Sequence, residues 1–446
     1  MLWNPCNEKR GRAEGTASDP LDRSGNVVTA AYYRHSAALS LEGIEPLIYD
    51  ALKQVALQHP PLGPIVKSMV HFVQLQDGRD EEVDALVEEQ QNMGFQQTYE
   101  QGWRLLIAYT YKQSTVSDLI VCFVVHEPLK DRFCGGLAFH RSFLAALLFA
   151  SEVNPSSQQT KEHSHFTSIR SLSKMSRSRS RALTGQSRFR TITLGTRETT
   201  RLLDISSSSK TNLTGVIQAA LVASLFANLP SEITTLYAEG RMSHGEFHSL
   251  GGNMANTNTS PCFSYIETHK RQELTTASVW NEARRIHSAT KAQLARKKEK
   301  AQIDSSQDRK RTKEVDTRDT MEVTMGVNVI VSNMGTFRYH KQPDSQQQQS
   351  WQAGTIICGN GGTELGATLS ITLVVGEDEC LTIGFSWSDS IIEEVWLDQV
   401  ILTLRKAIEE ILYTSGTTKG PLISDALPWG GSMSRLVYLV RDLMLE

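Results

Sequence analysis

The sequence predicts an α/β protein with two lobes of similar kind. Three observations lead to this fold class. Stretches typical of strands and of helices alternate along the chain, they fall into two blocks, and each block ends with strands next to a long helix. We therefore expect a poorly ordered N-terminal segment at 1–25, a first lobe at 26–151, a Ser- and Arg-rich linker at 152–187 and a second lobe at 188–446.

The composition is that of a globular protein. Of the 446 residues, 39% are apolar and 21% are charged, and 46 basic residues stand against 49 acidic ones. The net charge of −3 argues against a dedicated nucleic-acid binder, which is normally basic. The longest apolar runs, such as 121–125 and 143–150, are shorter than the ~18–20 residues that a membrane-spanning helix needs.

The cysteines and the N-terminal residues indicate the cellular compartment in which we expect the protein. None of the six cysteines lies in a CxxC pair, so we expect no metal site. Residues 1–12 lack the apolar core of a secretory signal peptide. Scattered, unpaired cysteines are typical of a reducing environment, and we expect the protein to be cytoplasmic.

The first block begins with a strand-like run at 26–33 and an amphipathic helix at 44–57. The motif HPPLGP ends this helix, because a helix cannot continue through its prolines. Three strands and a closing helix are predicted next, at 66–75, 105–111, 119–125 and 137–151. The strand at 119–125 is apolar on both faces, which is typical of the centre of a sheet.

The second block contains a helix at 214–227 that is apolar almost all round. Such a helix is expected to be buried between layers, and Thr211 and Asn212 are candidate caps for its start. The other predicted helices are 197–203, 277–300 and 391–412. The predicted strands are 188–194, 323–331, 367–375 and 380–387.

The segment 121–148, VCFVVHEPLKDRFCGGLAFHRSFLAALL, is the most informative for chemistry. It predicts a central strand, a turn, a Gly-containing loop and a buried helix. His126 ends the strand, where ligands bind in many α/β sheets, and Asp131 lies in the loop. An imidazole can take a proton from an alcohol near neutral pH. Gly135 and Gly136 allow a close backbone approach before the helix, in which we expect His140 to pack or cap.

This segment resembles the HHxxxDG motif of the acyl-CoA-dependent acyltransferases with the chloramphenicol acetyltransferase fold. The run GLAFHRSFLAAL resembles, more narrowly, the fungal alcohol acetyltransferases, and VNVIVSNMGTF at 327–337 resembles their Ser-Asn-x-Gly element in the second lobe. The elements GNVVTAAYY, TNLTGVIQAALVASL and GFSWSDSIIEEVW follow in the family's order. The resemblance covers roughly residues 25–415.

The resemblance implies two lobes with mixed sheets flanked by helices and an active-site tunnel at their interface. Acyl-CoA, with acetyl-CoA as the expected co-substrate, would enter from one side and a small-molecule alcohol from the other. A histidine would deprotonate the alcohol, which attacks the thioester directly, while the motif Asp131 orients the loop. The resemblance therefore implies an alcohol O-acetyltransferase of secondary metabolism that needs no bound cofactor and no metal.

The chain departs from the motif at the catalytic position. Four residues before Asp131 stands Glu127 where the family has its catalytic His, and Arg132 replaces the motif Gly. Anchoring the motif on Gly136 gives Pro128 and Arg132 instead. Three interpretations stay open: Glu127 is the base, His126 reaches in through a loop rearrangement, or the chain is a non-catalytic relative that binds a ligand or partner. An error in the gene model would produce the same pattern.

Other segments carry further expectations. Ser332 and Asn333 end an apolar strand, where a hydroxyl or amide could bind the thioester oxygen or the acceptor; an ordinary turn is the alternative. The pair His244 and His248 lacks the HExxH order of a zinc site. The amphipathic residues 434–446 predict a docking helix, with weak peripheral membrane contact as the alternative. We expect a monomer.

Overall fold

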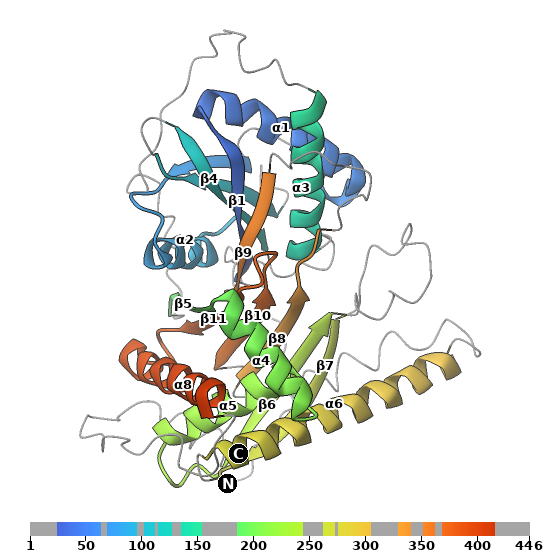
Figure 1. Cartoon of the computed structure of the whole chain (residues 1–446), viewed down its shortest axis with the longest axis vertical. Coiled ribbons are helices and arrows are strands. Elements are labelled where there is room, and N and C mark those ends of the chain that lie inside the picture. The colour runs from blue at the N-terminus through green and yellow to red at the C-terminus, as the bar shows by residue number, and fades with distance from the viewer. Residues whose placement is uncertain are drawn as a thin grey trace, which may run out of the picture.

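The computed structural model forms two lobes, one above the other in Figure 1. The residues that it describes are 25–63, 69–95, 102–111, 115–126, 135–153, 185–243, 262–272, 275–304, 329–339, 351–361 and 368–414. Each lobe contains one mixed β-sheet, and helices pack against the sheets, as the sequence predicts.

The first lobe has a five-stranded sheet of order β2-β3-β4-β1-β9. Its strands are β1 (Asn26–Leu39), β2 (Val70–Gln74), β3 (Trp103–Tyr109), β4 (Val116–His126) and β9 (Trp351–Asn360). Helices α1 (Leu41–Gln58) and α3 (Gly136–Val153) share one apolar cluster with the sheet, and α2 (Asp80–Asn92) shares another. A short 3-10 turn, η2 (Pro60–Leu62), follows α1. β4 is the third of the five strands, which confirms its predicted central place.

The second lobe has a six-stranded sheet of order β5-β11-β10-β8-β6-β7. Its strands are β5 (Ser187–Leu194), β6 (Thr235–Ser243), β7 (Cys262–Lys270), β8 (Val329–Thr336), β10 (Leu369–Val375) and β11 (Leu381–Ser388). Its helices are α4 (Thr196–Ser208), α5 (Leu213–Asn228), α6 (Thr276–Asp304) and α8 (Glu394–Thr414). The apolar side chains of α5 and α8 share one large cluster with alternate residues of the sheet.

Helix α5 shows how local sequence sets this core. The side chain of Asn212 accepts a hydrogen bond from the N–H of Gly215 at 2.9 Å and caps the helix start, as predicted. Thr211 has another role, because its hydroxyl donates to the carbonyl of Ala283 on α6 at 2.9 Å. With its apolar residues buried on all sides, α5 lies between the sheet and its neighbouring helices, as its composition predicts.

Strand β9 links the lobes. It belongs by sequence to the range 188–446, yet it pairs antiparallel with β1 of the first sheet, with Thr29 opposite Cys358. It also lies against β10, where the Thr372 hydroxyl donates to the carbonyl of Cys358. The division into the four ranges stays a prediction; most of the two segments 1–25 and 152–187 lies outside the described residues.

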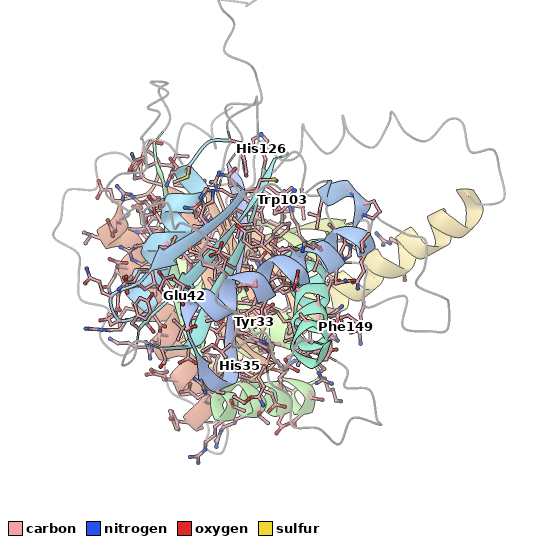
Figure 2. All side chains as sticks on the ribbon, turned by 90° about the horizontal axis from the view of Figure 1, so that it is seen from above. Tyr33, His35, Glu42, Trp103, His126 and Phe149 are labelled. Carbon is pink, nitrogen blue, oxygen red and sulfur yellow. The ribbon has the colours of Figure 1, made fainter. Side chains whose placement is uncertain are left out.

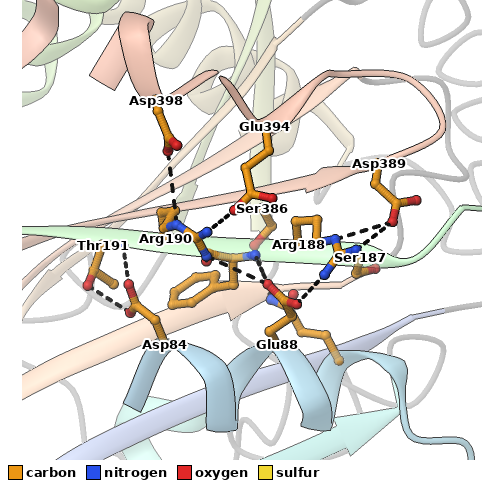
Figure 3. A network of polar contacts seen from close by, with 12 residues as sticks. Asp84, Glu88, Ser187, Arg188, Arg190, Thr191, Ser386, Asp389, Glu394 and Asp398 are labelled. Atoms are coloured by element: carbon orange, nitrogen blue, oxygen red, sulfur yellow. Dashed lines mark hydrogen bonds and ion pairs between the residues drawn. The ribbon is translucent and has the colours of Figure 1, made fainter. Parts of the chain in front are cut away.

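A polar network also joins α2 of the first lobe to the second lobe (Figure 3). Arg188 on β5 donates to Glu88 of α2 at 2.9 Å and to Asp389, just after β11, at 3.0 Å. Arg190, also on β5, contacts Glu88 at 3.8 Å and pairs with Glu394 of α8. Charged groups from α2, β5, α8 and the turn after β11 therefore meet at one contact between the lobes.

The carboxylate of Asp84 belongs to the same contact and is almost fully buried. It accepts hydrogen bonds from the Thr191 N–H at 2.9 Å and from the Thr191 hydroxyl at 2.8 Å. Burial nevertheless raises the pKa of Asp84 to about 6, since the loss of water disfavours the charged form more than these two donors favour it.

This pKa predicts how the variant Asp84→Asn responds to pH. Below about pH 4 the carboxyl is protonated in both states, whereas between about pH 4 and 6 only the folded protein holds the proton. Ionisation of Asp84 therefore reduces stability as the pH rises, by up to about 3 kcal/mol at pH 7. We expect the free energy of unfolding of Asp84→Asn, relative to wild type, to increase by most of this amount between pH 4 and 7.

Urea unfolding at intervals across this range measures the difference. Glu81→Gln, at an exposed position on the same helix, is the control and should show no such trend. A stability difference between Asp84→Asn and wild type that stays constant with pH would contradict the raised pKa.

The start of α3 lies very close to β1. A Cβ atom at Gly136 would lie 1.9 Å from the Oγ1 atom of Thr29, whereas a Cβ at Gly135 would meet no atom within 4 Å. Gly135 has a φ of +72°, a conformation that glycine adopts more readily than other residues. The two neighbouring glycines are thus required for different reasons, one for space and one for backbone conformation.

These reasons predict different costs for the two alanine variants. Gly136→Ala must push α3 away from β1, and we expect it to lose about 3 kcal/mol or more of stability. Gly135→Ala should lose about 1 kcal/mol, from its strained φ alone. Chemical denaturation of both variants side by side tests this, and equal losses would show that α3 can shift without strain.

Candidate active site

The candidate site is built around the connection from β4 to α3. β4 ends at His126 and α3 begins at Gly136, so the connection spans the motif region. The other two candidate catalytic residues, Glu127 and Asp131, lie outside the described residues. The structure therefore shows the two ends of the motif region.

His126 is half-buried at the last position of β4. Its backbone N–H donates to the carbonyl of Gly102 at 2.9 Å, and it stands opposite Asn26 of β1. Val124, two residues earlier, packs in the cluster that contains α2, and residues two apart in a strand share a face. The imidazole accordingly lies against Phe95, which follows α2, with 5.8 Å between the ring centroids. In Figure 2, His126 lies near Trp103 at one side of the lobe, and His35 at the other.

His140 is fully buried in the first turns of α3. Its Nε2 lies 3.0 Å from the carbonyl oxygen of Thr29, and since a carbonyl only accepts, Nε2 carries the proton. Nδ1 is then an acceptor for the Tyr33 hydroxyl, 3.0 Å away. Burial lowers the pKa of His140 to about 4, so the ring is neutral near pH 7. His140 thus ties α3 to β1, which agrees with the packing role expected of it.

Ser332 and Asn333 are half-buried on β8, and the strand continues to Thr336, so the prediction that they end the strand is wrong. The side chain of Asn333 donates to the Thr214 hydroxyl of α5 at 2.7 Å and accepts from the N–H of Gly335 at 2.8 Å. Gly335 has a φ of +82°, and the pairing of β8 with β10 shifts register at this point. Asn333 therefore shapes an irregular strand end, while Ser332 stands opposite Thr372 of β10.

A row of neighbours connects Ser332 to the start of α3. Thr372 donates its hydroxyl to the carbonyl of Cys358, and Cys358 is paired with Thr29 of β1. Thr29 is the residue that Gly136 approaches closely. The carboxyl half of β8 and the amino end of α3 consequently face the same boundary between the lobes (Figure 1).

Apolar packing supports this placement. Met334 and Phe337, at and just after the end of β8, belong to the cluster that contains Phe139 of α3. The guanidinium of Arg141 on α3 lies 5.9 Å from the ring centroid of Phe337. The structure thus brings together the glycine pair and the β8 end on the α3 side of the first sheet, while the side chain of His126 lies on the α2 side.

The sequence analysis did not identify several polar residues that lie near His126 or at the boundary between the lobes. Arg104 is 2% exposed in the otherwise apolar strand β3, and Asn26 is also buried beside the strand end. A single arginine in an apolar strand is a signal that a charge has internal partners, and it was available in the sequence. Thr29 and Thr372 carried no such signal, because small polar residues are common in strands.

Two absences hold for the described residues. They contain no group of three or more His, Cys, Asp or Glu side chains that could hold a metal ion. None of the helices among them is long and apolar enough to cross a membrane. His244 and His248, considered above for zinc, lie outside the described residues.

Comparisons with known proteins give a sequence relative and similar folds. No protein-family model matches the chain. The probable alcohol acetyltransferase crmB of Aspergillus fumigatus is 23% identical over 357 residues, covering 72% of this chain and 76% of the relative. The structure of TRI3, a trichothecene 15-O-acetyltransferase from Fusarium sporotrichioides, matches with a TM-score of 0.59 at 12% identity, covering 88% of this chain and 92% of that one.

A condensation domain has the same architecture. The first condensation domain of the CDA synthetase matches with a TM-score of 0.55 at 11% identity, covering 92% of this chain and 95% of that one. At such identities the solved structures show the fold, and the sequence relative supports the prediction of an acyltransferase enzyme. The predicted resemblance is thus confirmed: the chain is similar in sequence to a probable alcohol acetyltransferase, and it has the two-lobed fold of the TRI3 acetyltransferase and of a condensation domain.

Proposed function

We propose that the chain is an acyl-CoA-dependent O-acyltransferase that transfers an acetyl or other short acyl group to an alcohol. One observation carries the proposal. In a two-lobed acyltransferase fold, the segment that resembles the catalytic motif connects β4 to α3, at the boundary with the lobe that supplies Ser332. The acetyltransferase relative supports the reaction class.

The reaction needs a base, a hydrogen-bond donor to the thioester oxygen as it becomes negatively charged, and a thiolate leaving group. The base takes the proton of the acceptor hydroxyl, the resulting alkoxide attacks the thioester carbonyl, and the tetrahedral intermediate expels CoA as its thiolate. Ser332, half-buried in the middle of β8, is the candidate donor to the developing oxyanion. Asn333 holds the backbone of this strand end through Thr214 and Gly335. Gly135 and Gly136 allow α3 to start close to the proposed binding tunnel.

Two residues remain candidates for the base. His126 has the suitable chemistry, but its ring lies against Phe95 on the α2 side and must rotate away to reach the α3 side. Glu127 stands where the family has its histidine, and a carboxylate needs a raised pKa to accept a proton from an alcohol. Asp131 is proposed to orient the loop, as the resemblance implies.

A binding protein without catalysis is the second candidate function. The observation that favours it is the orientation of His126, whose ring faces Phe95, whereas Met334 of β8 packs in the cluster that contains α3. Such a protein would keep the tunnel for a ligand or partner. A third candidate is transfer to an amine, since the condensation domain shares the fold.

The setting of the reaction is part of the same proposal. We propose acetyl-CoA as the co-substrate, a small-molecule alcohol of secondary metabolism as the acceptor, and a cytoplasmic monomer as the working form. The acetylated trichothecene in the name of one fold relative is consistent with such an acceptor. Weak peripheral membrane contact through 434–446 is the alternative to docking of this segment.

Thiol release from acetyl-CoA tests the proposal. The wild type is compared with His126→Ala and Glu127→Gln on a panel of alcohols and amines. Loss of the base should reduce kcat about 100-fold or more, whereas His35→Gln, at the far side of the first lobe, should leave it unchanged. Only one of the two variants should show the full loss, and that one identifies the base.

The outcomes separate the three candidate functions. Alcohol-dependent release supports the O-acyltransferase, and release that depends only on amines supports the third candidate. If the wild type releases no thiol with any acceptor but acetyl-CoA raises its Tm, the chain is a binding protein. The proposal is refuted if the protein neither turns over nor binds acetyl-CoA.

A further inference from the structure

Arg104 is a buried charge that donates hydrogen bonds to the end of α2. Its guanidinium donates to the Gln90 side-chain oxygen at 2.7 Å and to the backbone carbonyls of Gln90 and Met93 at 3.2 and 2.8 Å. A further bond of 3.3 Å reaches the carbonyl of Gly94. The last carbonyls of a helix lack partners within the helix and carry partial negative charge, so a guanidinium satisfies them well.

Asn26 binds the same helix end from the neighbouring strand. Its side-chain amide donates to the carbonyls of Gln90 at 2.8 Å and Met93 at 2.6 Å. Asn26 stands directly opposite His126 in the pairing of β1 with β4. The carboxyl end of α2 is therefore fixed to the sheet at the position where His126 leaves it.

Phe95 lies between the buried arginine and the imidazole. The guanidinium carbon of Arg104 is 4.4 Å from the centroid of the Phe95 ring, within the range of a cation–π contact. The His126 ring contacts Phe95 with centroids 5.8 Å apart and planes inclined by 59°. Arg104, Phe95 and His126 thus form a continuous row of contacts.

We infer that Arg104 is a positioning residue for His126. It fixes the end of α2 and holds Phe95 in place, and Phe95 holds the imidazole on the α2 side of the sheet. This row of contacts thereby also sets where the chain leaves β4 toward Glu127 and Asp131. The effect on catalysis rests on the proposed function, whereas the effect on the imidazole does not.

The rate at which the C2 proton of the His126 ring exchanges with deuterium reports the mobility of the imidazole and its access to water. This measurement needs no substrate. Phe95→Leu keeps apolar bulk but removes the flat ring, and Arg104→Lys keeps the charge but removes the planar group that stacks and binds several carbonyls. We expect exchange at His126 to become about fivefold faster in either variant, because the ring gains freedom and access to water. Phe149→Leu and Arg34→Lys, both at exposed positions, are the matched controls.

The double variant tests whether Arg104 acts through Phe95. If it does, Arg104→Lys adds nothing to the exchange rate in the Phe95→Leu background. In acyl transfer, both single variants should lower kcat about tenfold with the KM for acetyl-CoA nearly unchanged, as expected when only the reacting group is displaced. Phe95 is half-buried, so its variant keeps the test valid even where Arg104→Lys is unstable.

The results distinguish this inference from the proposed function. Arg104→Lys that lowers the Tm but leaves exchange at His126 unchanged would overturn the inference, because Arg104 would then only cap α2. Unchanged exchange in an active enzyme would overturn it as well. Faster exchange in a protein without acyl transfer would support the positioning role and refute the proposed function.

Discussion

The placement of α2 between the two lobes is the constraint on which the rest of the structure depends. Its carboxylates bind the second lobe, through Glu88 to Arg188 and through Asp84 to Thr191. Its carboxyl end binds the first sheet through Arg104 and Asn26. Partly buried charges and helix ends need partners, so this one helix relates the second lobe to the strand end at His126.

The candidate site is shared between lobes for the same reason. The first lobe supplies the β4–α3 connection, and the second lobe supplies Ser332 on β8. Strand β9 lies between these parts, paired with β1 and bonded to Thr372. We propose that acyl-CoA and an alcohol react at this boundary. Such a reaction would depend on the contacts that fix the position of one lobe relative to the other.

Much of the architecture could be predicted from local sequence. The central strand β4 is apolar on both faces, and α5 is apolar all round with Asn212 at its start, so each was recognised and placed. The elements that the sequence did not reveal are α2, β6, β7 and β9. α2 is mostly polar, and its carboxylates bind residues of the other lobe. β9 pairs with β1, which lies more than three hundred residues earlier in the sequence.

For the site, the strand end at His126 and the glycine pair before α3 could be located. The direction of the imidazole could not, because it depends on Phe95 and Arg104, which precede it in the sequence and meet it only in the fold. A crystal structure of the chain with bound CoA tests the central claim most directly. We predict that CoA lies between the β4–α3 connection and the carboxyl end of β8. CoA bound elsewhere, with this boundary closed, would contradict it.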